Sequence, residues 1–226
     1  MIDKANRSES PLLVVEFYEG GIILQKRTME GGYTAYPVNP FEFQDAISQV
    51  GIISPILPET AVFWGHHKGD DVVAWWKKPG METILVESDV HVHTWRVPLP
   101  GMLVVLRGQE LAVCAVRGKT RPDENAWIFN VPLPNTESAM RGGQVCLGSA
   151  RLPEDAGINN LESVWNSYVG STFNSHRADD KCTSYPADVR LLLMELHDKG
   201  VTEFPEEELC PSETITLKEW HQRCFT

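Results

Sequence analysis

The residue whose type and surroundings point most directly to chemistry is Cys146, in the stretch Gly142-Gly143-Gln144-Val145-Cys146-Leu147-Gly148. A cysteine acts as a nucleophile only where a reactive group can approach its sulfur. Glycines on both sides leave room for that approach, because they carry no side chain. Glycine-rich segments after a strand lie in loops, where proteins often present catalytic groups. We therefore interpret Cys146 as a candidate nucleophile, although most free cysteines are buried apolar residues.

Two polar residues are candidates to assist this cysteine. Asn135 lies upstream of Cys146, and its amide could donate a hydrogen bond to the oxyanion that forms when the sulfur attacks a carbonyl. The alternative for Asn135, directly after Pro134, is a turn residue. His176 is the nearest downstream histidine and could pair with Cys146 as in thiol proteases. The alternative for His176 is an exposed loop position.

Other histidines and a pair of tryptophans raise weaker hypotheses. His91 and His93 would share one face of a strand, and with His66-His67 they could bind a metal ion. A metal site needs three or four ligands in a defined geometry, so surface histidines are the favoured interpretation. Trp75 and Trp76 would point to opposite faces of a strand, one into the core and the other toward a partner.

Composition indicates a globular protein of ordinary type. The 226 residues are 42% hydrophobic and 23% charged, with a net charge of −11. Residues 151–226 carry 14 acidic and 7 basic side chains, which argues against a surface that follows nucleic-acid phosphates. No apolar run approaches the length of a membrane helix, and residues 1–10 are polar, unlike a signal peptide. We expect a cytoplasmic protein that binds neither nucleic acid nor membrane.

The cysteines do not form a pattern typical of disulfides or zinc. There are five, an odd number, and no two have the spacing of a zinc knuckle: Cys114, Cys146, Cys182, Cys210 and Cys224. Reduced thiols are therefore expected, with Cys114 inside an apolar strand.

The first part of the chain predicts strands joined by short turns. Residues 12–17 and 22–26 predict an N-terminal hairpin, and Pro40 would start a helix over 41–50. Consecutive short strands then favour an antiparallel meander, with the strands at 102–107 and 110–117 in its middle. The other predicted strands are 61–64, 71–77 and 82–87.

After Cys146 the pattern becomes helical. Residues 161–168 and 186–199 carry apolar residues at helical spacing, with Pro186 in the first turn of the second helix and Gly200 at its end. Thr216 to Glu219 would open a last helix with a capping box, after a mobile acidic loop over 201–213. The fold class is α+β: an antiparallel β-meander flanked by helices, with an extra N-terminal hairpin.

Two short motifs together resemble a known family. Pro134-Asn135-Thr136, followed by Gly143-Gln144-Val145-Cys146-Leu147, resembles the active-site strip of ubiquitin-conjugating enzymes, in which His-Pro-Asn precedes Gly-x-Ile-Cys-Leu. This chain departs from that pattern at Leu133, which replaces the histidine, and in a longer interval between Asn135 and Cys146.

The wider order of motifs is similar to prokaryotic conjugating-enzyme-like family D, which includes the PRTRC system protein B. A hairpin, a Trp-containing strand, a Pro-rich stretch, a Val-Cys-Leu-Gly strip, a tryptophan and an aromatic-Asn-Ser stretch occur in this order over residues 12–176. They are represented here by 73–76, 97–100, 145–148, Trp165 and 173–175.

The resemblance implies a ubiquitin-conjugating-enzyme-like fold and a transthiolation reaction. Cys146 would accept a ubiquitin-like protein as a thioester from an activating enzyme and pass it to a lysine amine of a protein substrate, with Asn135 as the second catalytic residue. The resemblance implies no metal, nucleotide or other cofactor in this subunit. Bacterial relatives belong to operons of ubiquitin-like conjugation, some of them antiviral.

The expected organisation is one conjugating-enzyme-like domain over residues 1–226. It would comprise an N-terminal hairpin at 10–30, a core at 40–176 and a helical part at 177–226. Two alternatives stay open: a catalytically inactive module that binds the ubiquitin-like protein, and a cysteine hydrolase that uses Cys146 and His176.

Overall fold

The chain divides into two units, residues 1–53 and 54–226. In this computed structural model the described residues are 13–19, 21–28, 32–43, 56–67, 70–88 and 91–223, with the backbone alone at 66–67 and 212–214. The sequence predicted one domain over 1–226, and the extent of a conjugating-enzyme-like domain within the two units stays a prediction.

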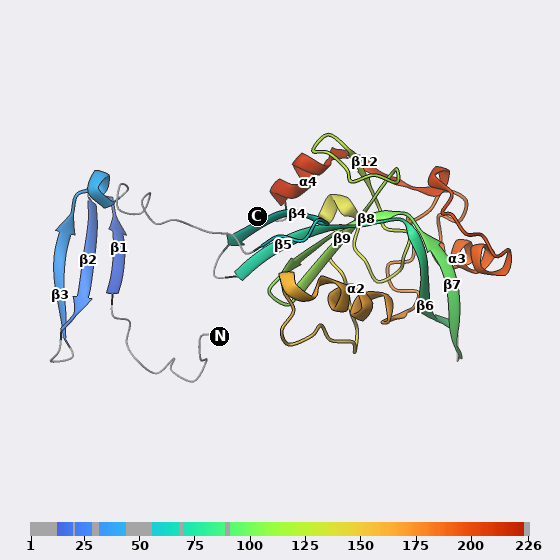
Figure 1. The fold of residues 1–226 in the computed structure, drawn as a ribbon, viewed down its shortest axis with the longest axis horizontal. Coiled ribbons are helices and arrows are strands. Elements are labelled where there is room, and N and C mark those ends of the chain that lie inside the picture. The colour runs from blue at the N-terminus through green and yellow to red at the C-terminus, as the bar shows by residue number, and fades with distance from the viewer. Residues whose placement is uncertain are drawn as a thin grey trace. The chain divides into compact units, whose positions relative to one another are not determined.

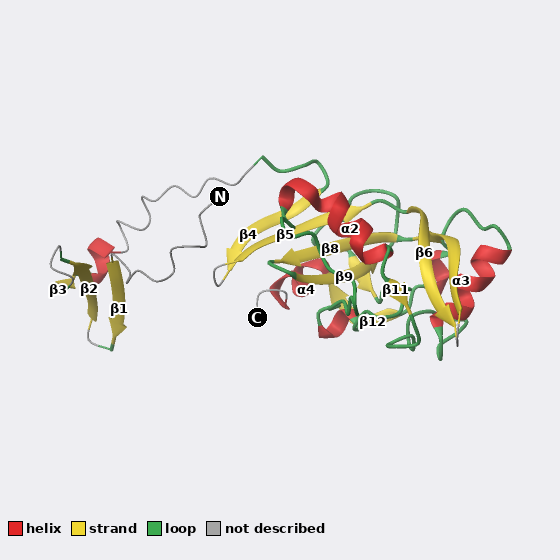
Figure 2. Cartoon of the chain, turned by 90° about the horizontal axis from the view of Figure 1, so that it is seen from below, coloured by secondary structure: helices red, strands yellow, loops and turns green. Residues whose placement is uncertain are grey.

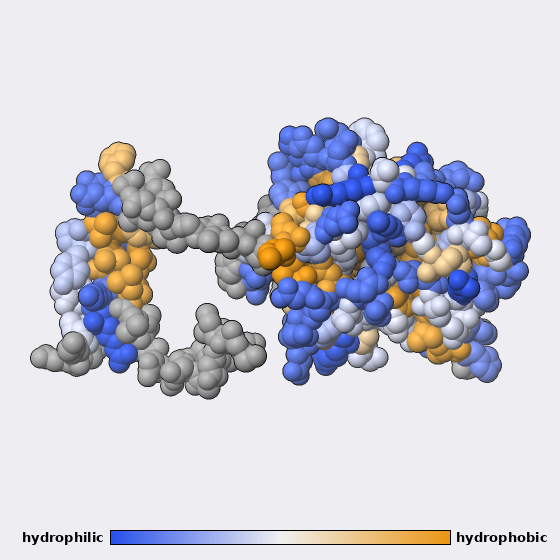
Figure 3. Space-filling view, in the orientation of Figure 1, coloured by the Kyte–Doolittle hydropathy of each residue, from blue (hydrophilic) through white to orange (hydrophobic). Residues whose placement is uncertain are grey.

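The first unit is an antiparallel sheet in the order β1-β2-β3, formed by Leu13–Tyr18, Gly21–Arg27 and Tyr33–Val38. The predicted hairpin is confirmed, whereas β3 was missed because its proline weakens the strand pattern. The register places Val15, Leu24 and Tyr36 in one row of an apolar face, and Figure 3 shows apolar residues gathered on this sheet. Residues 40–43 are helical, as predicted, and the rest of the helix at 41–50 lies outside the described residues.

The second unit is built on a six-stranded antiparallel sheet in the order β12-β10-β9-β8-β5-β4 (Figure 1). As predicted, β8 and β9 occupy its middle and are joined by a tight turn at Gly108. Both strands read as apolar runs because both faces of the sheet are covered. The strands are β4 Ala61–His67, β5 Asp70–Lys77, β8 Gly101–Arg107, β9 Glu110–Val116, β10 Trp127–Phe129 and β12 Pro211–Thr216.

A long bent hairpin replaces the simple meander that the sequence predicted. β6 (Gly80–Ser88) continues β5, and β7 (His91–Leu99) continues into β8, with no change of register across the break. Pro79 and Pro100 lie at the break, where their missing N–H groups interrupt the ladder. β5 therefore pairs with β8, and β6 and β7 leave the sheet to form a second one with the parallel strand β11 (Thr172–Phe173).

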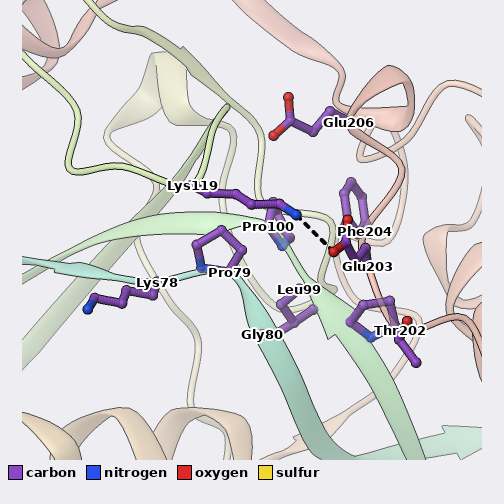
Figure 4. Close-up of a pocket in the computed structure, with 11 residues that line it drawn as sticks. Lys78, Pro79, Gly80, Leu99, Pro100, Lys119, Thr202, Glu203, Phe204 and Glu206 are labelled. Atoms are coloured by element: carbon purple, nitrogen blue, oxygen red, sulfur yellow. Dashed lines mark hydrogen bonds and ion pairs between the residues drawn. The ribbon is translucent and has the colours of Figure 1, made fainter.

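A pocket of about 400 Å³ lies at this bend (Figure 4). Prolines, Leu99 and Phe204 supply apolar surface, and the ion pair between Lys119 and Glu203, at 2.8 Å, lies at its side. The pocket thus marks the place where the two sheets separate.

Each face of the six-stranded sheet buries its own core. One core contains Trp75 and Trp165 and is covered by α2 (Leu161–Val169), and the other contains Trp76 and Trp220 and is covered by α4 (Leu217–Arg223). Figures 1 and 2 show these two helices on opposite sides of the sheet. The expectation that one of Trp75 and Trp76 faces a partner is wrong, because both are buried.

The C-terminal helices confirm the predicted elements but shift one boundary. α3 (Val189–Asp198) begins after Asp188, whose carboxylate accepts the Arg190 N–H at 3.0 Å, so Pro186 lies before the helix rather than in its first turn. Gly200 follows the helix with a φ of 62°, as a helix stop requires. The capping box of α4 is confirmed by reciprocal hydrogen bonds between Thr216 and Glu219.

The segment 201–213, predicted as a mobile acidic loop, is tied to the body of the unit. It contains the short 3-10 helix Glu206–Glu208 and then β12. The Glu206 carboxylate accepts the Gly118 N–H at 2.7 Å, and the Glu208 carboxylate accepts the Ser184 N–H at 2.9 Å. Its acidic side chains therefore anchor the segment by accepting backbone hydrogen bonds.

We expect Asp188→Ala to lower the free energy of unfolding by about 1 kcal/mol, because it removes the N-cap of α3. Asp188→Asn is the matched control, since its amide oxygen can still cap the helix although the ion pair with Arg190 is lost. Urea unfolding measures both variants, and an equal loss in both would show that the cap is not the stabilising contact.

Candidate active site

The segment that carries Cys146 lies alongside β9, where β10 ends. The Val113 N–H donates to the Gly143 carbonyl and the Val145 N–H donates to the Leu111 carbonyl, both at 2.8 Å. On its other side the segment contacts the strip 135–137, through a bridge between Thr136 and Val145. The cysteine thus stands at the end of a short strand-like segment held on both sides.

Gly143 is required by this packing. Its φ is 70°, and a Cβ there would lie 2.3 Å from the Val113 carbonyl oxygen. The sequence argument gave the flanking glycines the role of leaving room for a reaction partner. For Gly143 the structure shows a different reason, which is the close approach of the segment to β9. Gly148 has open space around it, with nothing within 4 Å of an added Cβ.

Cys146 is exposed, unlike two of the other cysteines that the structure describes. Its N–H donates to the Asn135 carbonyl at 2.7 Å, so the backbone is fixed while the side chain faces solvent. Cys114 and Cys182 are fully buried, Cys210 is partly exposed and Cys224 lies outside the described residues. Burial raises the pKa of Cys182 to about 11, so this thiol is a poor nucleophile.

Asn135 lies beside Cys146 and is only 5% exposed. Its side-chain Nδ2 donates to the Thr172 carbonyl at 2.9 Å, whereas its Oδ1 is buried without a hydrogen-bond partner among the described residues. The tertiary structure therefore brings together the two residues that the sequence proposed as catalytic. A backbone hydrogen bond joins the two residues, from the Cys146 N–H to the Asn135 carbonyl. One hydrogen of the Asn135 side-chain amide is donated to Thr172 in β11.

Left-handed backbone conformations cluster around this strip. Asn135, Arg177 and Asp180 are the non-glycine residues of the described chain with a positive φ, at 58°, 52° and 55°. Arg177 and Asp180 belong to the loop at 176–181, whose first carbonyl accepts the Asn135 N–H at 2.7 Å. Such conformations are costly for residues with a Cβ and tend to occur at functional sites.

His176 also lies close to the cysteine along the backbone. Its carbonyl is the acceptor for the Asn135 N–H, and the Asn135 carbonyl in turn accepts the Cys146 N–H. The His176 side chain is exposed, and no hydrogen bond joins its ring to Cys146 within the described part of the chain. The structure places the pair in one region without forming a thiol-imidazole contact.

A buried pair of hydroxyl groups, from Thr136 and Tyr168, holds the strip 135–137 in place. The sequence did not predict this contact. Thr136 Oγ1 donates to the Pro134 carbonyl at 3.3 Å and lies 2.8 Å from the Tyr168 hydroxyl. Either hydroxyl can be the donor of the bond between Thr136 and Tyr168. Both residues are fully buried, and burial raises the pKa of Tyr168. The helical spacing predicted that Tyr168 is buried, but no sequence signal identifies its partner.

The histidines proposed as metal ligands form a different arrangement. The rings of His91 and His93 are 6.3 Å apart, and His93 stacks toward Trp95 at 6.1 Å. The side chains of residues 66–67 are not among those described. Within the described ranges there is no group of three or more His, Cys, Asp or Glu residues that could hold a metal ion.

A comparison with known families identifies the class of protein. The sequence profile of prokaryotic E2 family D matches residues 42–212, and the chain belongs to that family. This confirms the resemblance drawn from the motifs, and family membership implies the E2 fold. No curated protein and no solved structure gives a significant match. E2 proteins work with an activating enzyme and a ubiquitin-like protein, so the family indicates a conjugating role and partners of those two kinds.

One further structural finding concerns membranes. Among the helices that the structure describes, none has both the length and the apolar character needed to span a bilayer.

We expect Gly143→Ala to destabilise the second unit more than Gly148→Ala. Both positions have a positive φ, which costs an alanine about 1–2 kcal/mol, but only the Gly143 variant adds a clash with β9, worth about 1–3 kcal/mol more. Urea unfolding gives the two free energies, and thiol labelling reports whether Cys146 has moved. Equal losses in the two variants would contradict the packing role of Gly143.

Proposed function

We propose that this chain is a conjugating enzyme that carries a ubiquitin-like protein as a thioester on Cys146 and transfers it to a lysine amine of a protein substrate. The observation that carries the proposal is the exposed cysteine at the end of a segment whose backbone is held by β9 and by Asn135. Family membership supports the class of reaction. A role in bacterial antiviral conjugation is part of this proposal and is supported by the resemblance alone.

The reaction that we propose has two acyl transfers. In the first, the Cys146 sulfur bonds to the carbonyl carbon of the activating-enzyme thioester, the old carbon–sulfur bond breaks, and the thiol proton passes to the departing sulfur. In the second, a lysine nitrogen bonds to the same carbon, the bond to Cys146 breaks, and an amine proton returns to the cysteine. Each step passes through an oxyanion that hydrogen-bond donors stabilise.

We expect Cys146→Ala to abolish a thiol-sensitive adduct with the ubiquitin-like partner in the presence of activating enzyme and ATP. Cys146→Ser should give either no adduct or an oxygen ester that resists reductant. Non-reducing gels and mass spectrometry of the residue-146 peptide provide the measurement. Cys210→Ser is the control, because Cys210 is the other partly exposed cysteine of the described residues, and it should charge normally. A normal adduct on Cys146→Ala would refute the assignment.

The two alternatives give different results in the same assay. A binding module would retain the ubiquitin-like protein without forming any covalent adduct on Cys146. A cysteine hydrolase would cleave a peptide or isopeptide bond and lose that activity in His176→Ala. The backbone proximity of His176 to Asn135 is the observation that favours testing the hydrolase.

We propose Asn135 as the oxyanion donor, through the amide hydrogen that does not bond Thr172. Asn135→Gly keeps the left-handed backbone but removes the amide, so we expect discharge of the thioester to lysine to slow by about 10²–10³. Single-turnover discharge gives the rate, and urea unfolding of the same variant reports how far loss of the Thr172 bond destabilises the strip. An unchanged discharge rate in folded Asn135→Gly would assign Asn135 a purely structural role.

A further inference from the structure

Lys181 is an almost fully buried lysine in the loop that follows His176. It is only 2% exposed, yet it forms no hydrogen bond or ion pair with any residue that the structure describes. Lysines are rarely buried to this extent unless an acceptor compensates the lost hydration. Among the described residues no acceptor serves the three N–H donors of its ammonium group, which is therefore left to bond solvent or a ligand in the pocket that it lines.

The Lys181 side chain lines a polar pocket of about 290 Å³. Thr136 and Glu137 form one wall, and the Glu137 N–H donates to the Gln144 carbonyl at 2.8 Å. This wall is thus the same strip that holds the segment of Cys146. The pocket is distinct from the exposed thiol but shares its supporting backbone.

The charges around the pocket leave two cations available. Arg177 is paired with Glu137 at 3.5 Å, whereas Arg141 is exposed and its side chain forms no hydrogen bond or ion pair with any described residue. Asp179 and Asp180 also line the pocket, but both are exposed and neither forms an ion pair with Lys181 or Arg141. Lys181 and Arg141 are therefore the cationic groups that a ligand can use.

The titration of Lys181 agrees with a missing acceptor. Burial lowers the pKa of Lys181 to about 8, although Asp179, Glu137 and Asp180 act in the opposite direction and Arg177 adds to the lowering. The nearby carboxylates thus do not replace the lost hydration. At pH 7 the amine is still mostly protonated, so an incoming acceptor would meet a cation.

We propose that this pocket binds a free carboxylate, held by Lys181 and Arg141, from an amino acid or from the C-terminal residue of a polypeptide. A carboxylate supplies acceptor atoms that the described residues do not provide for the Lys181 ammonium, and charge-assisted hydrogen bonds of this kind are strong. The N–H or ammonium group next to an α-carboxylate then faces Asp179 and Asp180 at the edge of the pocket. Mixed charges in the lining therefore favour an α-carboxylate over a simple anion, which the acidic residues would repel.

The test uses acetyl-glycylglycine as the probe and its C-terminal amide as the matched control. We expect saturable binding of the free acid at pH 7 by calorimetry, with a Kd of about 1 mM or tighter, and at least about tenfold weaker binding of the amide. Free glycine is the second arm. Binding equal to that of the peptide indicates an amino acid as the source of the carboxylate, and clearly weaker binding indicates a polypeptide end.

Three variants make the proposal falsifiable. Lys181→Met should fold, since a buried unpaired charge is replaced by an apolar side chain of similar length, and it should lose at least about tenfold in affinity. Arg141→Gln should weaken binding as well. Lys119→Met, at the pocket near the bend, should leave binding unchanged. Equal binding of acid and amide, unchanged binding by Lys181→Met, or no saturation at about 10 mM would overturn the proposal.

The pH dependence gives an independent readout. Because the carboxylate binds the protonated amine, affinity should fall as the pH rises through about 8 and Lys181 loses its proton. Lys181→Met should remove this dependence. The measurement needs no activating enzyme, so its outcome is separate from the test of the proposed conjugating activity.

Discussion

The backbone hydrogen bonds around the segment from Gly143 to Cys146 are the constraint on which the candidate site depends. They insert this segment between β9 and the strip 135–137, and they stop at the cysteine. A side chain at Gly143 does not fit because the segment lies against the carbonyl of Val113. The ladder therefore fixes the cysteine backbone firmly and leaves its sulfur in solvent. The proposed thioester chemistry would use this combination of a rigid support and an open side chain.

The rest of the second unit provides the rigid support. β8 and β9 are buried on both faces, and the apolar side chains of each strand alternate between the core under α2 and the core under α4. The hairpin that bends at Pro79 and Pro100 sends β6 and β7 out of the main sheet, where they pair with β11. β11 in turn supplies the carbonyl that holds the Asn135 amide. The bend thus connects the architecture of the sheets to the position of a candidate catalytic side chain.

Polar groups that are buried around the strip explain why it has one defined conformation. The hydroxyl pair of Thr136 and Tyr168 has no solvent to replace a lost partner, so a shift of the strip would leave a buried donor unsatisfied. The left-handed residues Asn135, Arg177 and Asp180 add a local energetic cost that the surrounding contacts must offset. The pocket of Lys181 uses the same strip as a wall. The pocket and the segment of Cys146 therefore share one short stretch of supporting backbone.

The sequence by itself determined the local features: the central strands at 102–107 and 110–117, the helix that buries Tyr168, the capping box of Thr216 and Glu219, and the cysteine motif of the family. These depend on periodicity and on contacts between near neighbours, which a sequence displays directly. Only the tertiary structure decided that Asn135 touches the cysteine backbone, that Trp75 and Trp76 are both buried, and that the Lys181 side chain is buried with no acceptor among the described residues. These facts depend on which distant segments meet and on the bend at Pro79 and Pro100 that separates β6 and β7 from the main sheet. The local sequence pattern carries no information about long-range contacts or about the direction of such a bend.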